Sequence, residues 1–330
     1  MMDTKQQFYV GLDTHKEKIF ATALTKDGEI FCSREFPNNK KAIETFFKGF
    51  SSVNTSIGIE ACNFWRGPYK ILRNLGFIVR LANPVKVSKF ADEKKTDEVD
   101  SKIIADLDRT GFFPEIWIPS DEILELRDIT RHKLSIMKER IRIQNKIKSY
   151  LCRDGIGYPK NLWKKSGIEW LKSLKNKEID CLIRTFYFLK EEEKIAKDNV
   201  IKAGGKNEDI ILLDTIKGVA SYGAAIIYAE IGDINRFPTP KHLHAYAGLA
   251  PGIYQSGDKS RPQKRYQVNY NLKWIIGECS GRAIMIKSKL SKDYKRICEK
   301  KGWKIAKRVI NRKLLTIIWF ILKEKISYHE

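Results

Sequence analysis

The chain of 330 residues is long enough for two or three hydrophobic cores at the usual size of a domain. Its 62 Lys and Arg residues outnumber the 40 Asp and Glu residues, which leaves a formal net charge of +22. Because so large an excess of cations repels itself, the composition argues against a cationic partner and favours a nucleic acid, although a general preference for lysine gives the same count.

The cysteines and the apolar runs narrow the class of protein further. The six cysteines are scattered and form no Cys-x-x-Cys pair, which argues against a zinc knuckle and against a disulfide framework. We expect free thiols in a reducing compartment. The longest apolar run, residues 314–322, is too short to span a bilayer. We therefore expect a soluble cytoplasmic protein with no membrane partner.

The N-terminal third is predicted to alternate strands with helices. Apolar runs bounded by turn residues predict strands at 8–13, 19–24, 29–36, 56–60 and 77–82, with a turn at Asn83-Pro84. Apolar periodicity predicts helices at 40–50, 64–75 and from residue 97. This order describes an α/β layer with a mixed sheet, in which ligands gather at the strand ends.

Two carboxylates stand close together where the last of these helices begins. Thr96 is a suitable N-cap, and acids in the first turn suit the helix dipole. Asp97 and Asp100 then share one helical face. Because like charges repel unless a cation lies between them, the pair reads as half of a metal site. The alternative is a solvated, acid-rich helix start.

Two further acids close apolar runs of the predicted sheet. Asp13 ends the first strand and Glu60 ends the strand at 56–60. Taken alone, Asp13 reads as a turn former and Glu60 as a surface acid. Four converging acids would be costly without cations. With two Mg²⁺ ions, or Mn²⁺, they would form a clamp that activates an attacking oxygen and stabilises a leaving one, so the four together favour a metal site for phosphoryl transfer.

Long helices are predicted beyond Pro119. Ser120 and Asp121 cap a helix that extends to about Leu151, with Ile129, Ile136, Ile143 and Tyr150 repeating every seven residues. A second amphipathic helix, from about residue 179, ends near Gly204-Gly205. We interpret the pair as an antiparallel, coiled-coil-like arm used for dimerisation or RNA contact, and residues 153–175 receive no assignment.

The first arm helix carries a basic face. Its cations are Lys138, Arg140, Arg142, Lys146 and Lys148. Any one of these lysines reads best as a solvated surface residue, whereas the face as a whole is equally compatible with phosphate contact.

The C-terminal third is predicted to be mainly helical. A helix ending near Gly218 and a second at 224–231 form a helical hairpin that either offers backbone N–H groups to a phosphate or simply packs. Thr239-Pro240 opens another helix. The final helices, at 291–300 and 303–325, carry further cations that include Lys307 and Arg308.

A serine before glycine lies in a predicted loop rich in cations. Ser256 is followed by Lys259, Arg261, Lys264 and Arg265, which would offset the charge of a phosphodiester. From spacing alone it reads as a polar loop serine. His242 and His244 fall on the preceding helix, so a nucleophilic serine would need activation from elsewhere, such as the metal site.

Three blocks of the N-terminal third resemble the DEDD transposases of the IS110 family of insertion sequences (the IS116/IS110/IS902 type), relatives of Piv-type DNA invertases. They are Gly-Leu-Asp-Thr-His-Lys-Glu at 11–17, Ile-Glu-Ala at 59–61 and Lys-Thr-Asp-Glu-Val-Asp at 95–100. Relatives often carry Thr-Gly where this chain has Cys62-Asn63, and Ala where it has Ser101.

Residues 211–290 resemble the C-terminal transposase domain of the same family. The shared patterns are Leu-x-x-Ile-x-Gly-Val, Ile-Gly-Asp-x-x-x-Phe, Gly-Leu-Ala-Pro and Ser-Gly, in that order. Relatives often carry Gly-Asn where this chain has Tyr270-Asn271. The resemblance therefore extends over nearly the whole chain.

The resemblance implies a fold, a reaction and partners. It implies a RuvC-like, ribonuclease H-type mixed-sheet domain at 1–115, a helical coiled-coil-like arm at 116–205 and a mainly helical transposase domain at 206–330. The family's metal-binding acids fall on Asp13, Glu60, Asp97 and Asp100, and its serine nucleophile on Ser256. It also implies donor and target DNA, a non-coding guide RNA, a homo-oligomer (dimer or tetramer) and a bacterial or archaeal, nucleoid-associated location.

Three functions remain open at this stage. The first is an RNA-guided recombinase that uses the four acids and the serine. The second is a metal-dependent nuclease like a Holliday-junction resolvase, with no covalent serine step. The third is a nucleic-acid-binding protein without catalysis, which the presence of all five residues disfavours. In each, we expect the nucleic acid to be held by basic residues: Lys138, Arg142, Lys146, Lys259, Arg261, Lys264, Arg265, Lys307 and Arg308.

Overall fold

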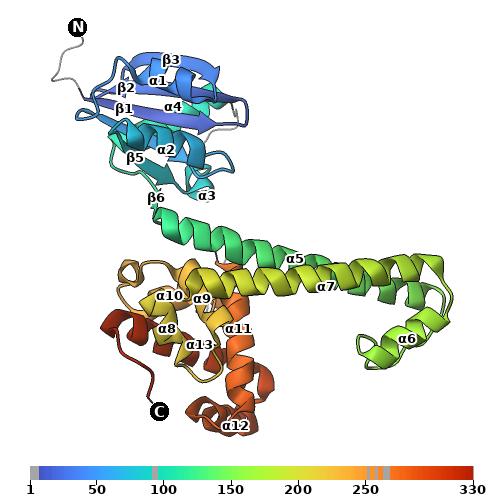
Figure 1. Cartoon of the computed structure of the whole chain (residues 1–330). Helices are drawn as coiled ribbons and strands as arrows, with labels where there is room; N and C mark the ends of the chain where they lie inside the picture. The colour runs from blue at the N-terminus through green and yellow to red at the C-terminus, as the bar shows by residue number, and fades with distance from the viewer. Residues whose placement is uncertain (1–6, 91–95, 251–252, 257–258, 263–267, 330) are drawn as a thin grey trace. The chain divides into compact units, whose positions relative to one another are not determined.

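The computed structural model describes the chain except for residues 1–6, 91–95, 251–252, 257–258, 263–267 and 330 (Figure 1). Contacts divide the chain into two compact units, Met1–Ile118 and Pro119–Glu330. The predicted division at 115 and 205 remains a prediction. Each unit is described by itself.

The described residues of the first unit form a six-stranded mixed sheet, as predicted. The strand order is β3 (Ile30–Pro37), β2 (Lys18–Thr25), β1 (Phe8–Thr14), β4 (Thr55–Glu60), β5 (Ile78–Ala82) and β6 (Glu115–Ile116). The β1–β4 and β4–β5 pairs are parallel, and the other neighbours are antiparallel. The helices are α1 (Lys40–Phe47), α2 (Arg66–Asn74), α3 (Pro84–Val87) and α4 (Asp97–Arg109).

Two of these elements differ from the sequence prediction. A turn was predicted at Asn83, but the Asn83 side chain accepts a hydrogen bond from the Val85 backbone N–H and caps the short helix α3. Strand β6 was not predicted, because two residues are too few to show an alternating pattern.

The central strands are covered on both faces. The even-numbered residues of β1, Val10 and Leu12, share a core with Phe47 of α1 and Leu72 of α2. The opposite face lies against α4. A Cβ at Gly11 would lie 1.9 Å from the Ser101 carbonyl oxygen, and a Cβ at Gly58 would lie 2.8 Å from the Ile104 side chain. The lack of a side chain at these two glycines therefore lets α4 approach the sheet closely.

Polar contacts fix α4 at this distance. The Ser101 hydroxyl lies 2.7 Å from the Thr22 hydroxyl of β2 and donates to the Glu98 carbonyl, so the serine where relatives often have alanine ties the first turn of α4 to the sheet. Near the other end of α4, the buried Asp108 carboxylate pairs with Arg80 of β5.

The second unit begins with the predicted helical arm. Helix α5 (Asp121–Arg153) and helix α7 (Lys177–Gly204) lie side by side, and α6 (Lys165–Ser173) lies at their far end within the stretch that received no assignment (Figure 1). Apolar residues including Ile147, Leu151 and Phe186 form the core of this far end.

The predicted coiled-coil seam is only partly correct. The middle of the α5–α7 interface is polar, because Glu193 of α7 accepts from Lys133 at 3.0 Å and from Arg140 at 2.6 Å. Arg140 was assigned to the basic face but is half-buried in this interface. The α5–α7 interface is therefore apolar at its two ends, and paired charges take the place of the predicted apolar seam in its middle.

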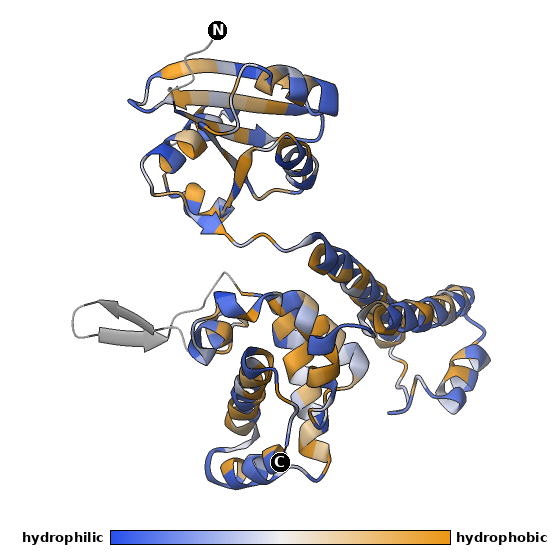
Figure 2. Ribbon diagram, turned by 60° about the vertical axis from the view of Figure 1, so that its left-hand side comes forward, coloured by the Kyte–Doolittle hydropathy of each residue, from blue (hydrophilic) through white to orange (hydrophobic). Residues whose placement is uncertain are grey.

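The remaining helices form a bundle. They are α8 (Glu208–Asp214), α9 (Ser221–Ile231), α10 (Pro240–Tyr246), α11 (Tyr270–Met285), α12 (Lys289–Lys301) and α13 (Trp303–Glu324). Helix α9 is buried almost throughout, whereas the outer faces of α5 and α7 are polar (Figure 2). Gly218 has a φ of +95°, and a Cβ there would lie 2.6 Å from the Ala283 backbone nitrogen, so this glycine has a packing role. Among the described helices, none has the length and apolar character needed to cross a membrane.

A buried acid organises the centre of this bundle. Glu230 of α9 is fully buried, and its carboxylate accepts two hydrogen bonds from the Arg131 guanidinium, both at 2.9 Å. It also accepts from the Asn269 amide at 2.8 Å and the Asn271 amide at 3.0 Å. Burial alone would raise the pKa of Glu230, but these hydrogen bonds hold that pKa below its usual value.

We predict that Gly11→Ala lowers the free energy of unfolding by about 3 kcal/mol, because the added methyl group overlaps the α4 backbone. The matched control is Gly67→Ala in α2, where a Cβ meets no atom within 4 Å and a change within about 1 kcal/mol is expected. Urea denaturation followed by circular dichroism measures both. Equal stability of the two variants would contradict the account of the α4–sheet contact.

We predict that Arg131→Met lowers the free energy of unfolding by about 3 kcal/mol at pH 7, because the buried Glu230 carboxylate loses its charged partner. The pKa of Glu230 in the folded protein lies below its usual value, so the ionised carboxylate stabilises the fold fully above the ordinary glutamate pKa. This stabilisation is lost as the pH falls through the pKa that Glu230 has in the folded protein. The difference between variant and parent should therefore shrink in acid.

The control for this prediction is Arg142→Met, since Arg142 pairs with the half-exposed Glu139 within α5 and should contribute little. Chemical denaturation at pH 7 and near pH 4 measures both variants. A pH-independent loss in Arg131→Met would show that the Glu230 charge is not responsible.

Candidate functional site

Two of the predicted acids end neighbouring parallel strands. The β1–β4 pairing runs to Leu12 and Ile59, so Asp13 and Glu60 are the next residues on the two strands. They lie two residues beyond Gly11 and Gly58, and side chains alternate between the faces of a strand. Asp13 and Glu60 are therefore on the face that α4 covers, and both are half-buried.

The other two acids lie in the first turn of α4. The helix begins at Asp97, and the Thr96 hydroxyl accepts from the Val99 backbone N–H, which confirms the predicted N-cap. Asp97 precedes the buried Ser101 by one helical turn, so it lies on the stripe that packs against the sheet. Asp100 is half-buried on the same turn.

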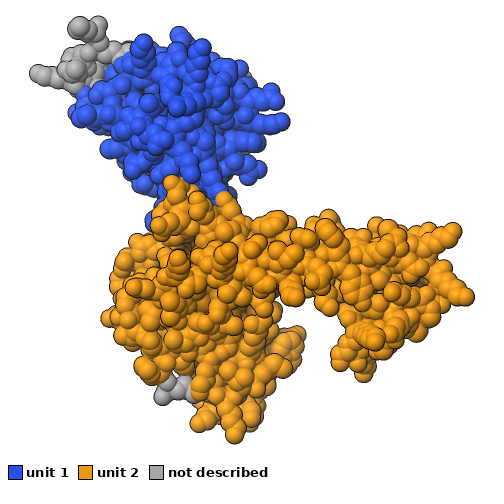
Figure 3. All heavy atoms as spheres, viewed as in Figure 1, with its two compact units in different colours: residues 1–118 blue, residues 119–330 orange. Residues whose placement is uncertain are grey.

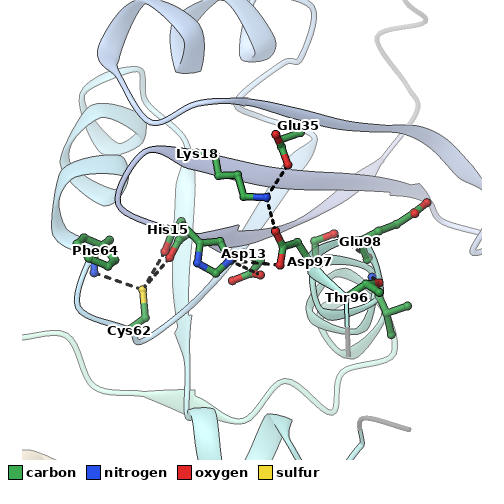
Figure 4. Close-up of polar contacts among 12 residues, drawn as sticks. Asp13, His15, Lys18, Glu35, Cys62, Phe64, Thr96, Asp97 and Glu98 are labelled. Carbon is green, nitrogen blue, oxygen red and sulfur yellow. Dashed lines mark hydrogen bonds and ion pairs between the residues drawn. The ribbon is translucent and has the colours of Figure 1, made fainter. Parts of the chain in front are cut away.

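Figure 4 shows how the side chains at this edge of the sheet meet. The His15 Nε2 atom lies 3.1 Å from Asp13 Oδ2 and 3.4 Å from Asp97 Oδ1. The Lys18 ammonium lies 2.8 Å from Asp97 Oδ2 and 2.8 Å from Glu35 Oε2. Ligand atoms of Asp13, His15 and Asp97 all lie within 4.8 Å of one another, which is a spacing that could hold a metal ion.

The pKa values of the two clustered carboxyl groups, those of Asp13 and Asp97, are shifted in opposite directions. Burial raises the pKa of Asp13, and repulsion from Asp97 and Asp100 raises it further against the opposing attraction of His15. A hydrogen bond from Lys18 lowers the pKa of Asp97. The Asp100 charge thus contributes to the raised pKa of Asp13, whereas the group of ligand atoms within 4.8 Å of one another among the described residues is Asp13, His15 and Asp97. The four acids' role as metal ligands remains a prediction.

No role was predicted for His15 or Lys18 from the sequence. Both border the short turn that joins β1 to β2, and each has a side-chain atom within 3.4 Å of Asp97. The position of His15 two residues after Asp13 was an available signal, because that spacing places both side chains on one side of an extended chain. The Lys18–Asp97 contact joins residues too far apart in sequence for a local pattern to reveal.

Cys62 connects the ends of the two acid-bearing strands. Its Sγ atom lies 3.0 Å from the Thr14 hydroxyl and 3.2 Å from the Thr14 carbonyl oxygen. The Phe64 backbone N–H donates to the same sulfur at 3.3 Å. The residue that departs from the common family pattern therefore holds the loop after Glu60 against the end of β1.

Ser256 lies in a β-hairpin, and the predicted loop is wrong at this point. Strand β7 (Ile253–Ser256) pairs antiparallel with β8 (Lys259–Pro262), and Ser256 is opposite Lys259. The β-branched Ile253 and the aromatic Tyr254 favour an extended backbone here. Arg261 also lies on β8, and the backbone alone is described for both strands. Lys264 and Arg265 lie outside the described residues.

Both ends of the hairpin segment are anchored to the bundle. The Asn269 backbone N–H donates to the Tyr246 carbonyl at 2.8 Å, and the Asn269 side chain donates to Glu230. Gly248 has a φ of +65°, and a Cβ there would lie 2.8 Å from the Val268 side chain. The buried Glu230 network therefore fixes Asn269, where the chain enters α11.

The basic residues of α5 and α13 that were predicted to contact nucleic acid lie on exposed surfaces. Lys138, Arg142 and Lys146 are exposed on α5, and Lys307 and Arg308 are exposed on α13. Their side chains are therefore accessible to a phosphate backbone, and their role in binding remains a prediction. The acids belong to the unit of residues 1–118 and Ser256 to that of residues 119–330, which Figure 3 colours separately.

Known proteins match both units. Residues 10–153 match a family model of DEDD type described as a transposase, and residues 211–296 match one described as the transposase IS116/IS110/IS902 family.

The chain is also similar to individual members of such families. It is 25% identical over 292 residues to the transposase for insertion sequence element IS1111A of Coxiella burnetii, covering 82% of this chain and 78% of the relative. It is 28% identical over 269 residues to the pilin gene-inverting protein of Moraxella lacunata, covering 76% of this chain and 74% of the relative.

The sheet with its acid-bearing strand ends, the helical second unit and the two matches in their expected order lead to one assignment. The chain belongs to the IS110/IS116/IS902 family of transposases, enzymes of DNA phosphoryl transfer.

Proposed function

We propose that this transposase cuts and rejoins DNA through a metal-bound tetrad of Asp13, Glu60, Asp97 and Asp100 together with Ser256 as nucleophile. The meeting of Asp13 and Asp97 supports the tetrad most directly. Asp13 ends a strand and Asp97 begins a helix 84 positions later. Ligand atoms of Asp13, Asp97 and His15 nevertheless lie within 4.8 Å of one another. The register of Glu60 and the repulsion between Asp100 and Asp13 support the other two.

The site fits divalent cations on chemical grounds. Carboxylate oxygens are the ligands that Mg²⁺ prefers, and Mn²⁺ accepts the same set. A bound pair of such ions would supply Lewis-acid stabilisation of the attacking and leaving oxygens. The acids would hold these cations. The pKa of Asp13 is raised first by burial and then by repulsion from Asp97 and Asp100, and a cation would relieve this repulsion.

The serine step is a transesterification that conserves the phosphodiester bond. The Ser256 oxygen attacks the scissile phosphorus and loses its proton to a base, while the departing DNA oxygen takes up a proton. The product is a phosphoserine link to one strand end. A hydroxyl of the recipient strand then attacks that phosphorus, rejoins the DNA and returns the proton to Ser256. No net hydrolysis occurs and no free end is released.

The basic surfaces serve two polyanions in this proposal. A non-coding guide RNA pairs with donor and target DNA and supplies the sequence choice, while exposed cations of α5 and α13 contact the backbones. We propose that a homo-oligomer brings Ser256 to the acids. The net charge of +22 supports a partner with many phosphates.

A metal-dependent nuclease is the second candidate. It is favoured by the fact that the ligand atoms of Asp13, His15 and Asp97 come together within one compact unit. Such an enzyme would hydrolyse the DNA and leave free ends, which separates it from the serine mechanism.

We predict that Mg²⁺ raises the melting temperature of the parent chain and that Asp13→Asn abolishes this shift, because a carboxamide carries no charge to attract the cation. The control is Glu35→Gln, an acid that contacts Lys18 but lies outside the tetrad and should leave the shift intact. Thermal denaturation at increasing Mg²⁺ measures this. An unchanged shift in Asp13→Asn would remove Asp13 from the metal site.

We predict that Ser256→Ala abolishes strand exchange and the covalent protein–DNA adduct while DNA binding stays within about twofold of the parent, because only the attacking oxygen is lost. The matched control is Ser260→Ala on β8, opposite Gln255 in the same hairpin, which should keep both activities. Denaturing gels detect the adduct. Strand cleavage that persists in Ser256→Ala with free ends would establish the nuclease instead.

A further inference from the structure

The second unit contains a cavity that plays no part in the acidic cluster or the serine step. It has a volume of about 820 Å³ and lies among α10, α12, α13 and the residues that follow α13. Its apolar lining is formed by Ala245, Leu290, Val309 and Ile317. A volume in this range accommodates a small organic group such as a nucleobase with its sugar.

The charges around the cavity are strongly positive. Four cationic side chains line it: Lys241, Lys289, Arg312 and Lys313. The lining includes one acid, Asp293, which is already paired with Lys313 at 2.5 Å and Arg296 at 3.0 Å. These two hydrogen bonds lower the pKa of Asp293 and offset its charge. The cavity therefore suits a ligand with an apolar body and an anionic group.

Polar groups that suit a nucleobase also line the cavity. His244 Nε2 lies 3.0 Å from the Thr316 hydroxyl, and both residues are half-buried. Burial lowers the pKa of His244, which keeps its ring neutral and able to donate from one nitrogen and accept at the other. Tyr328 adds an aromatic ring to the lining.

We propose that this cavity binds one unpaired nucleotide of a single-stranded segment, with the base in the apolar interior and the phosphate against the cations. A polynucleotide fits better than other anionic amphiphiles because its next phosphates would continue onto the basic surface of a chain with net charge +22. Ala250 lines the cavity and β7 begins at Ile253, so the bound nucleotide would lie near the base of the Ser256 hairpin. The proposal requires the nucleic-acid partner but not the serine step.

The test uses the full chain and fluorescent 15-nucleotide single strands of RNA and of DNA. Ile317→Trp fills the cavity, and Arg312→Ala removes one cation from it. We expect each to weaken single-strand binding about tenfold, the loss typical of one stacked base. The controls are Ile305→Trp on the same helix and Lys172→Ala on α6, both exposed and outside the lining, which should change the affinity by less than about twofold.

A perfectly paired duplex of the same length separates this cavity from general charge effects. Since a paired base cannot enter, Ile317→Trp should leave duplex binding unchanged. Adenosine monophosphate should compete with the single strand at concentrations where inorganic phosphate does not. The RNA and DNA arms identify which strand is bound.

Several results would overturn the proposal. One is that the cavity variants bind the single strand as tightly as the controls do. Another is that Ile317→Trp weakens duplex binding as much as it weakens single-strand binding. Self-association that fails in the cavity variants while single-strand binding persists would assign the cavity to a protein segment. If Ile317→Trp does not fold, crosslinking of a 4-thiouridine RNA replaces it, with adducts expected at residues 309–329 and absent after Arg312→Ala.

Discussion

The close approach of α4 to the sheet is the constraint on which the first unit depends. It exists because Gly11 and Gly58 leave no side chain between strand and helix, and because Ser101 bonds to Thr22 across the gap. The same geometry brings Asp13, two positions beyond Gly11, close to Asp97 at the start of the helix. The repulsion among acids is therefore imposed by backbone packing, and the energy of the core holds these like charges near one another.

In the second unit, a buried charge fixes how the helices are arranged. Glu230 is fully buried and accepts hydrogen bonds from α5 and from both asparagines that flank Tyr270 at the start of α11. Such a network specifies one arrangement because any shift leaves a buried carboxylate unsatisfied. It explains why Tyr270-Asn271 in place of the common Gly-Asn does not disturb the local turn: Asn269 caps α11 through the Leu272 N–H.

Much of the first unit could be predicted from sequence because its signals are local. Apolar runs, a capping threonine and acids at strand ends each depend on a few neighbouring residues, and the mixed sheet followed from them. The Lys18–Asp97 contact could not be predicted, since it depends on how the β1–β2 turn faces α4. The arm seam was over-predicted because a heptad of isoleucines does not reveal that Lys133, Arg140 and Glu193 pair in its middle. The hairpin at Ser256 was mistaken for a loop because its strands have only four residues each and glycines precede and follow the first.

The electrostatics of the acidic cluster suggest why it tolerates its own repulsion. Lys18 supplies a cation at Asp97, and the His15 ring lies beside both acids. Both side chains are nearly half-exposed, with Lys18 45% and His15 47% accessible. Exposed ion pairs contribute little stability and rearrange readily. An entering divalent ion would therefore exchange one cation for another at Asp97. The pKa of Asp13 is raised first by burial and then by repulsion from Asp97 and Asp100, and the ion would relieve that repulsion. Under the proposed metal role, the contact with Lys18 keeps Asp97 ionised and positioned beforehand.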